Sequence, residues 1–160
     1  MVGIEIKGFK DIAESARSAI EILRYWNAKA TKENISMLAK RASKKARYKT
    51  GALRRDVLDP NNQIIKRDGD TIIGTYGSNL PYSAIQELGG TIKAHTVKVR
   101  TRKVLADGKG NFFGKSANIP ARYQPPHPYL FPALIEGIDE ALDKYRDYYK
   151  KASDEVESKK

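Results

Sequence analysis

The chain has 160 residues, 40% of them hydrophobic, which is enough for one domain with a single core and argues against wholesale disorder. It contains no cysteine, which excludes disulfides, thiolate metal sites and a cysteine nucleophile and is typical of a protein made in a reducing cytoplasm. The 30 Lys and Arg outnumber the 19 Asp and Glu, giving a formal net charge of +11 and predicting a polyanion or an acidic protein surface as partner.

The charge is divided into zones along the chain. Residues 29–55 carry ten bases and one acid, and residues 91–122 carry eight bases and one acid. Residues 56–90 have five acids and two bases, and residues 133–160 have eight acids and six bases. Acidic and basic zones on one chain allow copies or partners to associate by charge complementarity, although a Lys-rich helix face can also simply be solvated.

The first 50 residues are predicted to be mostly helical. Alternation over residues 4–6 indicates a short strand, and neither a secretory signal nor a membrane-spanning run is recognisable in the sequence. Apolar residues spaced by three and four from Ile12 to Trp26, and again from Ile35 to Ala46, predict two helices or one long helix with a bend in 27–34. Gly51 is expected to end this helical region.

Antiparallel strands and a short helix are predicted next. Residues 63–66 and 71–76 have the composition of strands, and Asp68-Gly69 between them is a hairpin-turn signal. A short helix is expected over 81–88, followed by a strand over 91–99. This strand leads into a projecting basic hairpin, about 95–118, with its turn at 107–110.

Prolines stiffen the crossing from 119 to 128, and a last helix is expected to open at Pro132. Its apolar face runs from Leu134 to Tyr149, and Phe131 is expected in the core. We therefore predict an α+β fold in which a long N-terminal helical region and a C-terminal helix pack on an antiparallel sheet. Residues 1–152 would form one domain, and 153–160 a charged, disordered tail.

Recognisable catalytic chemistry is missing from the sequence. His95 and His127 lack a second ligand at metal-binding spacing, the glycine segments do not match a phosphate-binding loop, and the acids form no convincing pair. We therefore expect no enzyme activity, cofactor or metal. A basic nucleic-acid-binding protein is the alternative, since the bases of 40–55 could neutralise phosphates and Tyr48 could stack on bases.

Four ordered segments carry a family resemblance. They are Thr50-Gly51-Ala52-Leu53-Arg54-Arg55, then Gly77-Ser78-Asn79-Leu80-Pro81-Tyr82-Ser83-Ala84, then Gln86-Glu87-Leu88-Gly89-Gly90-Thr91, and last Ile119-Pro120-Ala121-Arg122 with Pro128-Tyr129-Leu130-Phe131-Pro132-Ala133-Leu134. Together they resemble the virion morphogenesis and tail-completion proteins that join heads to tails in long-tailed bacteriophages. Asp56 departs from the family pattern, which has Ser there, and extra residues separate Arg122 from Tyr129.

The resemblance implies a structural virion protein, made in the host cytoplasm, that forms a homo-oligomeric ring, often of six copies, at the head–tail junction. Its partners would be head-completion or connector proteins and tail-tube or terminator proteins, with passing contact to DNA and none to a membrane. We assign interface roles to motif residues and to bases and aromatics of the hairpin. These residues are Arg54, Arg55, Tyr82, Glu87, Arg100, Arg102, Lys103, Phe112, Phe113, Arg122 and Tyr129.

Overall fold

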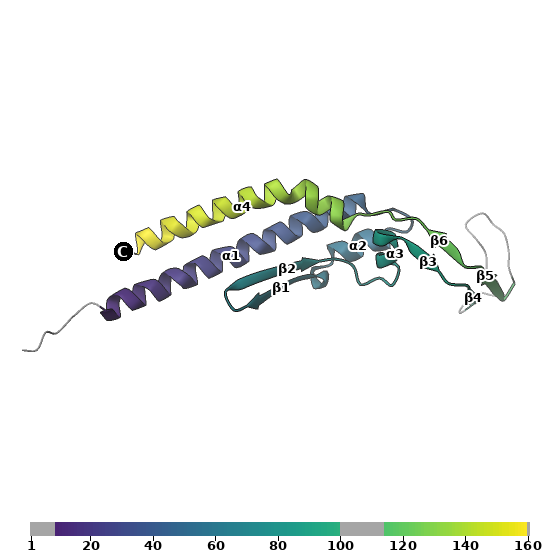
Figure 1. The fold of residues 1–160 in the computed structure, drawn as a ribbon, viewed down its shortest axis with the longest axis horizontal. Helices are drawn as coiled ribbons and strands as arrows, with labels where there is room; N and C mark the ends of the chain where they lie inside the picture. The colour runs from purple at the N-terminus through teal and green to yellow at the C-terminus, as the bar shows by residue number, and fades with distance from the viewer. Residues whose placement is uncertain (1–8, 100–113, 160) are drawn as a thin grey trace, which may run out of the picture. The chain divides into compact units, whose positions relative to one another are not determined.

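The computed structural model describes residues 9–99 and 114–159 (Figure 1). The chain divides into two compact units, which we call the helical unit (Met1–Leu80 with Tyr129–Lys160) and the strand unit (Pro81–Pro128). The α+β class, with a long N-terminal helix and a C-terminal helix, is as predicted. The expected strand at 4–6 and the hairpin turn at 107–110 lie outside the described residues.

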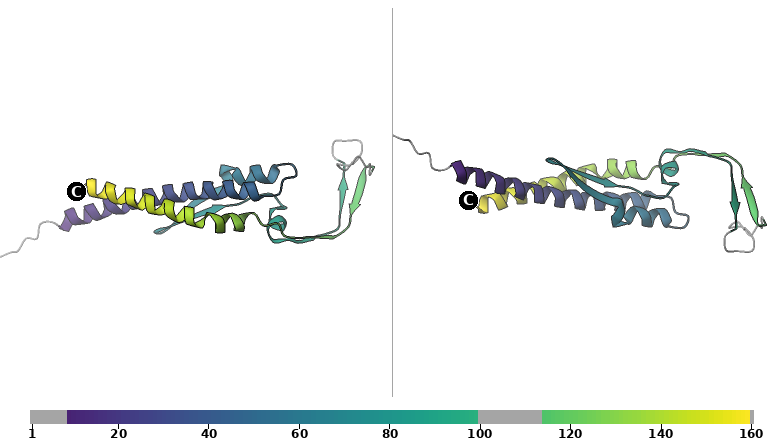
Figure 2. Two further views of the ribbon diagram at one scale, coloured as in Figure 1. Left: turned by 90° about the horizontal axis from the view of Figure 1, so that it is seen from above. Right: turned by 90° about the horizontal axis from the view of Figure 1, so that it is seen from below.

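Helix α1, Phe9–Lys45, is the scaffold of the helical unit, because α4, α2 and the hairpin of β1 and β2 all pack on it. The helix is continuous through residues 27–34, where the sequence allowed either one long helix with a bend or two helices. Polar residues of this stretch contact α4: the Asn34 side chain donates to the Ala141 carbonyl at 3.0 Å, and the Thr31 hydroxyl lies 2.8 Å from the Tyr145 hydroxyl. These bonds fasten α1 to α4, Leu130–Ser158, which lies beside it in both views of Figure 2.

The core of the helical unit is built from small residues. Ala39, Ala42 and Ala46 of α1 lie with Tyr129 and Ala133 in one buried cluster, to which α2, Ala52–Leu58, adds Leu53 and Val57. Gly137 permits close approach of the helices, since a Cβ there would lie 2.6 Å from Cδ2 of Leu38. Helix α4 continues to Ser158, so the tail expected to be disordered is helical, with Ala152 buried and the Trp26 indole donating to Glu155 at 2.8 Å.

A hairpin covers another side of α1. Strand β1, Gln63–Asp68, follows the short 3-10 turn η1, Pro60–Asn62, and pairs antiparallel with β2, Thr71–Tyr76. Asp68 pairs with Thr71, so the two turn residues are Gly69 and Asp70, one position later than predicted. Only Gly69 has a positive φ, 57°, which fits a turn that needs glycine at its first position alone rather than at both.

The strand unit is one long hairpin with an interruption. Helix α3, Ser83–Leu88, leads to β3, Gly90–Ile92, which pairs with β6, Arg122–Gln124; farther along, β4, His95–Lys98, pairs with β5, Ser116–Ile119. The register continues across the gap between the two ladders, where Pro120 has no backbone N–H to donate. The strand expected over 91–99 is therefore split in two.

The predicted single sheet is absent. Within the described residues the strands form three separate two-stranded ladders, and α4 packs on α1 instead of on a sheet. The predicted helices and strands are present, but each strand pairs with a single partner and the ladders do not join into one sheet.

Candidate assembly surfaces

Ion pairs hold the C-terminal half of α1 against the first half of α4. The Lys45 ammonium lies 2.6 Å from the Glu136 carboxylate, and Arg41 pairs with Glu140 while donating to the Glu136 carbonyl at 3.3 Å. The Arg41 guanidinium, and then Lys144, hold the pKa of Glu140 below its usual value. These groups are partly solvated, so they fix the register of the helices more than they stabilise them.

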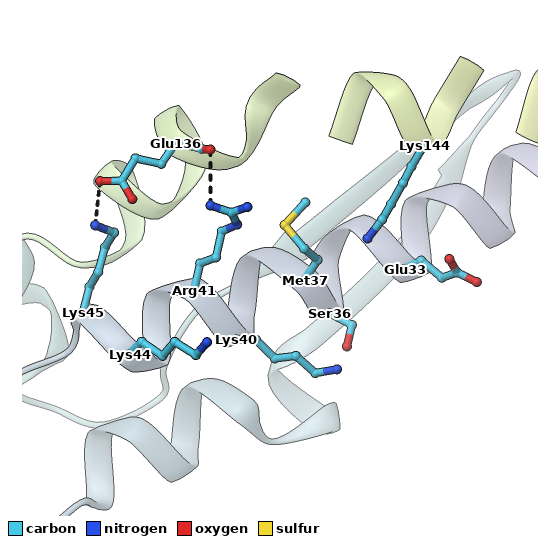
Figure 3. A pocket seen from close by; sticks show the side chains of 9 residues that line it. All are labelled: Glu33, Ser36, Met37, Lys40, Arg41, Lys44, Lys45, Glu136 and Lys144. Atoms are coloured by element: carbon cyan, nitrogen blue, oxygen red, sulfur yellow. Dashed lines mark hydrogen bonds and ion pairs between the residues drawn. The ribbon is translucent and has the colours of Figure 1, made fainter. Parts of the chain in front are cut away.

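A basic hollow of about 840 Å³ opens beside these pairs (Figure 3). It is lined by Glu33, Ser36, Met37, Lys40, Arg41, Lys44, Lys45, Glu136 and Lys144. Both lining acids are engaged, Glu136 with Lys45 and Glu33 as acceptor from the Tyr148 hydroxyl. Within the described part of the chain, the exposed ammonium groups of Lys40 and Lys44 have no ion-pair partner. The hollow can therefore hold an anion by charge.

The outer face of α4 carries an uncovered apolar patch. Its members are Phe131 (64% exposed), Leu134 (39%), Ile135 (55%), Ile138 (45%) and Leu142 (48%), which we call the α4 patch. Their spacing by three and four places them on one side of the helix, while Ala133 and Gly137 face α1. Phe131 was expected in the core, and that prediction is wrong: the core positions of this segment are taken by Tyr129 and Ala133.

Acids border the α4 patch, and most of them are paired with bases. Glu136, Glu140 and Asp143 pair with Lys45, Arg41 and Arg146, whereas Asp139 is in no ion pair within the described residues. Asp139 and Asp143 are exposed beside the patch. Large apolar side chains gathered on one exposed face with polar edges are typical of a protein-binding site.

The described residues of the strand unit form no buried core. Among its described residues, 81–99 and 114–128, none is buried. Large apolar side chains stand in solvent, including Leu88 (77% exposed) and Tyr123 (68%). The two strand ladders and a few local contacts hold its described residues together. The His127 N–H donates to the Gln86 carbonyl at 2.7 Å. Gly89, at φ 72°, leaves room for Pro126, because a Cβ on residue 89 would lie 2.9 Å from the Pro126 nitrogen.

The predicted interface residues have several different positions. Arg55, Tyr82 and Arg122 are exposed, and Glu87 is half-buried in α3. Arg100, Arg102, Lys103, Phe112 and Phe113 lie outside the described residues.

Two of the assigned residues have structural roles inside the helical unit. Tyr129 is fully buried in the core, so in this structure its side chain offers no surface. Arg54 caps the end of α1, donating from Nε to the Ala46 carbonyl at 2.8 Å and lying over the Tyr48 ring at 5.2 Å. A base at a helix C-terminus also interacts favourably with the helix dipole.

A hydrogen-bond network centred on Asp56 was missed from the sequence. Its carboxylate accepts from the Ser78 hydroxyl at 2.6 Å and from the Asn79 N–H at 2.8 Å, and these bonds, that of Ser78 first, lower its pKa. Asn62 donates to the Asp56 carbonyl at 2.7 Å. The network joins α2 to the segment after β2. In the sequence, the presence of both Asp56 and the Gly77-Ser78-Asn79 motif was the only indication that these two segments interact.

Both histidines lie in the strand unit, and both are exposed. His95 Nδ1 lies 2.9 Å from the Lys93 carbonyl. Over residues 9–99 and 114–159, no group of three His, Cys, Asp or Glu is placed to hold a metal ion. In the same residues, no helix is long and apolar enough to cross a membrane.

Comparison with known proteins returns no match: no family model, curated protein or solved structure is similar to this chain.

Proposed function

We propose that the chain is a structural virion protein of a long-tailed bacteriophage, which forms a ring of its own copies at the head–tail junction and completes the junction by binding head-side and tail-side proteins. The observation that carries the proposal is that no described residue of the strand unit falls in the buried class. An isolated two-stranded hairpin is marginal in water, so such a unit gains its stability from a partner. A part of the chain that needs a partner to be stable suits a protein whose task is assembly.

The family motifs have roles consistent with this proposal. Leu53 of the first motif and Tyr129 and Ala133 of the last lie in one buried cluster. The Tyr76 hydroxyl donates to the Leu130 carbonyl at 3.0 Å, which brings the β2 end to the start of α4. Motifs far apart in sequence thus support one another in the fold, as expected if they mark a common architecture. In the proposed role the chain acts through surfaces and carries out no catalysis.

Size and shape in solution test this proposal. We expect the purified protein, alone or mixed with purified tails, to form a discrete oligomer, six copies if the resemblance holds, seen as rings by negative-stain microscopy and by mass in sedimentation. A chain that stays monomeric at high concentration and does not bind tails or head connectors would refute it.

Deleting residues 101–115 and closing β4 to β5 with Asn-Gly tests the role of the hairpin tip. We expect this variant to keep the helical unit folded, because the residues that form the core of that unit lie outside the deletion, yet to lose joining activity. The measurements are the thermal unfolding midpoint and the yield of infectious particles when tails and heads are mixed. Full joining by the deletion variant contradicts the assigned role of the tip.

The basic hollow favours a second candidate function, binding of nucleic acid through charge. Lys40 and Lys44 are exposed there without ion-pair partners in the described residues, and Tyr48, 68% exposed, lies in the same basic zone. Binding of this kind falls steeply with salt. Tight binding to duplex DNA that weakens between low and physiological salt, and that Lys40→Gln with Lys44→Gln reduces, would favour this function over the ring.

A further inference from the structure

We infer that the basic hollow between α1 and α4 binds a ligand that presents neighbouring phosphate groups, either a free polyphosphate or the backbone of a nucleic acid. The hollow belongs wholly to the helical unit, and all the residues that line it are described. The inference goes beyond the proposed ring, because it concerns a ligand that one chain binds whether or not it assembles. Three properties of the lining lead to it: unpaired positive charge, a free hydroxyl donor and a wall that is already held in place.

The hollow has more positive charge than nearby acids neutralise. Its lining holds five bases and two acids, a net charge of 5 − 2 = +3. Glu140, which does not line the hollow but pairs with Arg41 and Lys144, lowers this to 3 − 1 = +2. Lys40 and Lys44 are in no ion pair within the described part of the chain, so their ammonium groups are available to a ligand. A phosphate group, with a charge of about −1.5 to −2 at neutral pH, would balance this surplus.

Three hydrogen-bond donors form a row along α1. Ser36, Lys40 and Lys44 are spaced by four residues, so they follow one another on the same side of the helix at intervals of about 6 Å along its axis (Figure 3). The Ser36 hydroxyl is half-buried and forms no hydrogen bond with another described residue. A phosphate group has three strong acceptor oxygens, whereas a carboxylate has two and a single charge. Two ammonium groups and a hydroxyl therefore match phosphate better than a carboxylate.

The side of the hollow next to α4 is held in place by ion pairs. Arg41 is fixed by the Glu140 carboxylate and the Glu136 carbonyl, and the Lys45 ammonium lies 2.6 Å from the Glu136 carboxylate. A wall that is ordered before the ligand arrives lowers the entropy lost on binding. The volume of about 840 Å³ lies within the range of small-ligand sites, about 300–1,000 Å³. The hollow is therefore large enough for several linked phosphate groups.

Calorimetric titration of the full chain with sodium tripolyphosphate, at physiological ionic strength, tests the site. Lys40→Gln with Lys44→Gln should weaken binding by about tenfold or more, because both free ammonium groups are lost. The matched control, Lys66→Gln with Lys150→Gln, removes the same charge at exposed positions of β1 and α4 outside the hollow. It should keep the affinity within about twofold, since distant charges are screened. Equal weakening by both pairs would show that net charge alone attracts the ligand and would overturn the inference.

Ser36→Ala separates recognition of phosphate from attraction by charge. The substitution removes one donor and no charge, so we expect binding to weaken about threefold to tenfold, at low and at physiological salt alike. Ser36→Thr keeps the hydroxyl and should bind like the wild type. An unchanged affinity of Ser36→Ala would reduce the hollow to a patch of positive charge and would contradict the inferred site.

Two further ligands identify the source of the phosphate groups. Duplex DNA that tripolyphosphate displaces, and that Lys40→Gln with Lys44→Gln binds more weakly, would place a nucleic-acid backbone in the hollow. Tripolyphosphate binding with which DNA does not compete would assign the hollow to a free polyphosphate. Both results support the inference. A hexa-aspartate peptide bound as tightly as tripolyphosphate, and weakened by the same two substitutions, would make the hollow a site for acidic protein segments and would overturn it.

Footprinting of the wild-type chain keeps the test decisive if a substitution disturbs folding. Lysine acetylation by a water-soluble reagent, followed by mass spectrometry, reports which ammonium groups a ligand covers. We expect tripolyphosphate to slow acetylation most at Lys40 and Lys44, with the exposed Lys66 and Lys150 as internal references. Equal slowing at all four lysines would mean that the ligand has no preferred site, and the inference would fail.

Discussion

The helical unit and the strand unit are built on opposite principles. In the helical unit, alanines at helical spacing let α1, α2 and α4 approach closely around Tyr129, and the unit encloses its own core. In the strand unit, backbone ladders exist, but no described residue is buried. The contrast teaches that burial is divided unequally along one chain: the helical unit encloses a core, whereas no described residue of the strand unit is buried.

The largest difference in stability between the two units is expected from alanine substitution of one tyrosine in each. Tyr129→Ala empties a fully buried site in the helical core and is expected to cost about 3–5 kcal/mol of the free energy of unfolding. Tyr123→Ala, at a position 68% exposed in the strand unit, is expected to change the monomer by less than about 0.5 kcal/mol. Urea unfolding of dilute protein measures both. Equal losses would mean that the strand unit has a core of its own.

A smaller effect is expected where β2 rests on α1. A Cβ on Gly74 would lie 2.8 Å from Cγ2 of Thr31 and 2.8 Å from Cγ1 of Ile35. Gly74→Ala should therefore push the hairpin from the helix and cost about 1–3 kcal/mol. Gly77→Ala is the control, because nothing lies within 4 Å of its Cβ position. A stabilised Gly74→Ala protein, measured by its thermal midpoint, would contradict this close packing.

The sequence predicted local structure better than it predicted what covers each surface. Apolar spacing correctly indicated helices around Ile12 and Ile20, yet these side chains are 69% and 45% exposed. Periodicity defines a face but does not supply its partner. The same is true of Phe131, which its hydrophobicity predicted to be in the core. In the structure Phe131 is exposed, and the smaller Ala133 lies in the buried cluster.

Side-chain chemistry explains the other differences. Arg54 and Tyr129 belong to recognisable motifs, but whether a motif residue caps a helix, fills a core or meets a partner depends on contacts between segments distant in sequence. The Asp68-Gly69 signal located the hairpin, but the strand register moved its turn by one residue. The strands at 91–99 and 119–124 were foreseeable as extended segments, and their interruption follows from Pro120.

The finest contrast within the helical unit concerns Asp56, which stands where the resembled family has Ser. Its charged carboxylate accepts from Ser78 and Asn79, so Asp56→Asn, which weakens both bonds, should cost about 1 kcal/mol near neutral pH. Because these bonds lower the folded pKa below the usual 3.8, the contribution of Asp56 is fully present above the unfolded pKa and is lost as the pH falls through the folded one.

The difference in stability between wild type and Asp56→Asn should therefore be constant above about pH 5 and shrink below about pH 4. Chemical unfolding at a series of pH values measures it, with Asp59→Asn as the comparison for a second acid at the end of α2. Asp59 accepts from the Asn61 backbone N–H at 2.9 Å, within its own turn, whereas Asp56 joins α2 to the segment after β2. A difference that grows on acidification would mean that the Asp56 carboxylate is strained in the folded state rather than stabilised by Ser78.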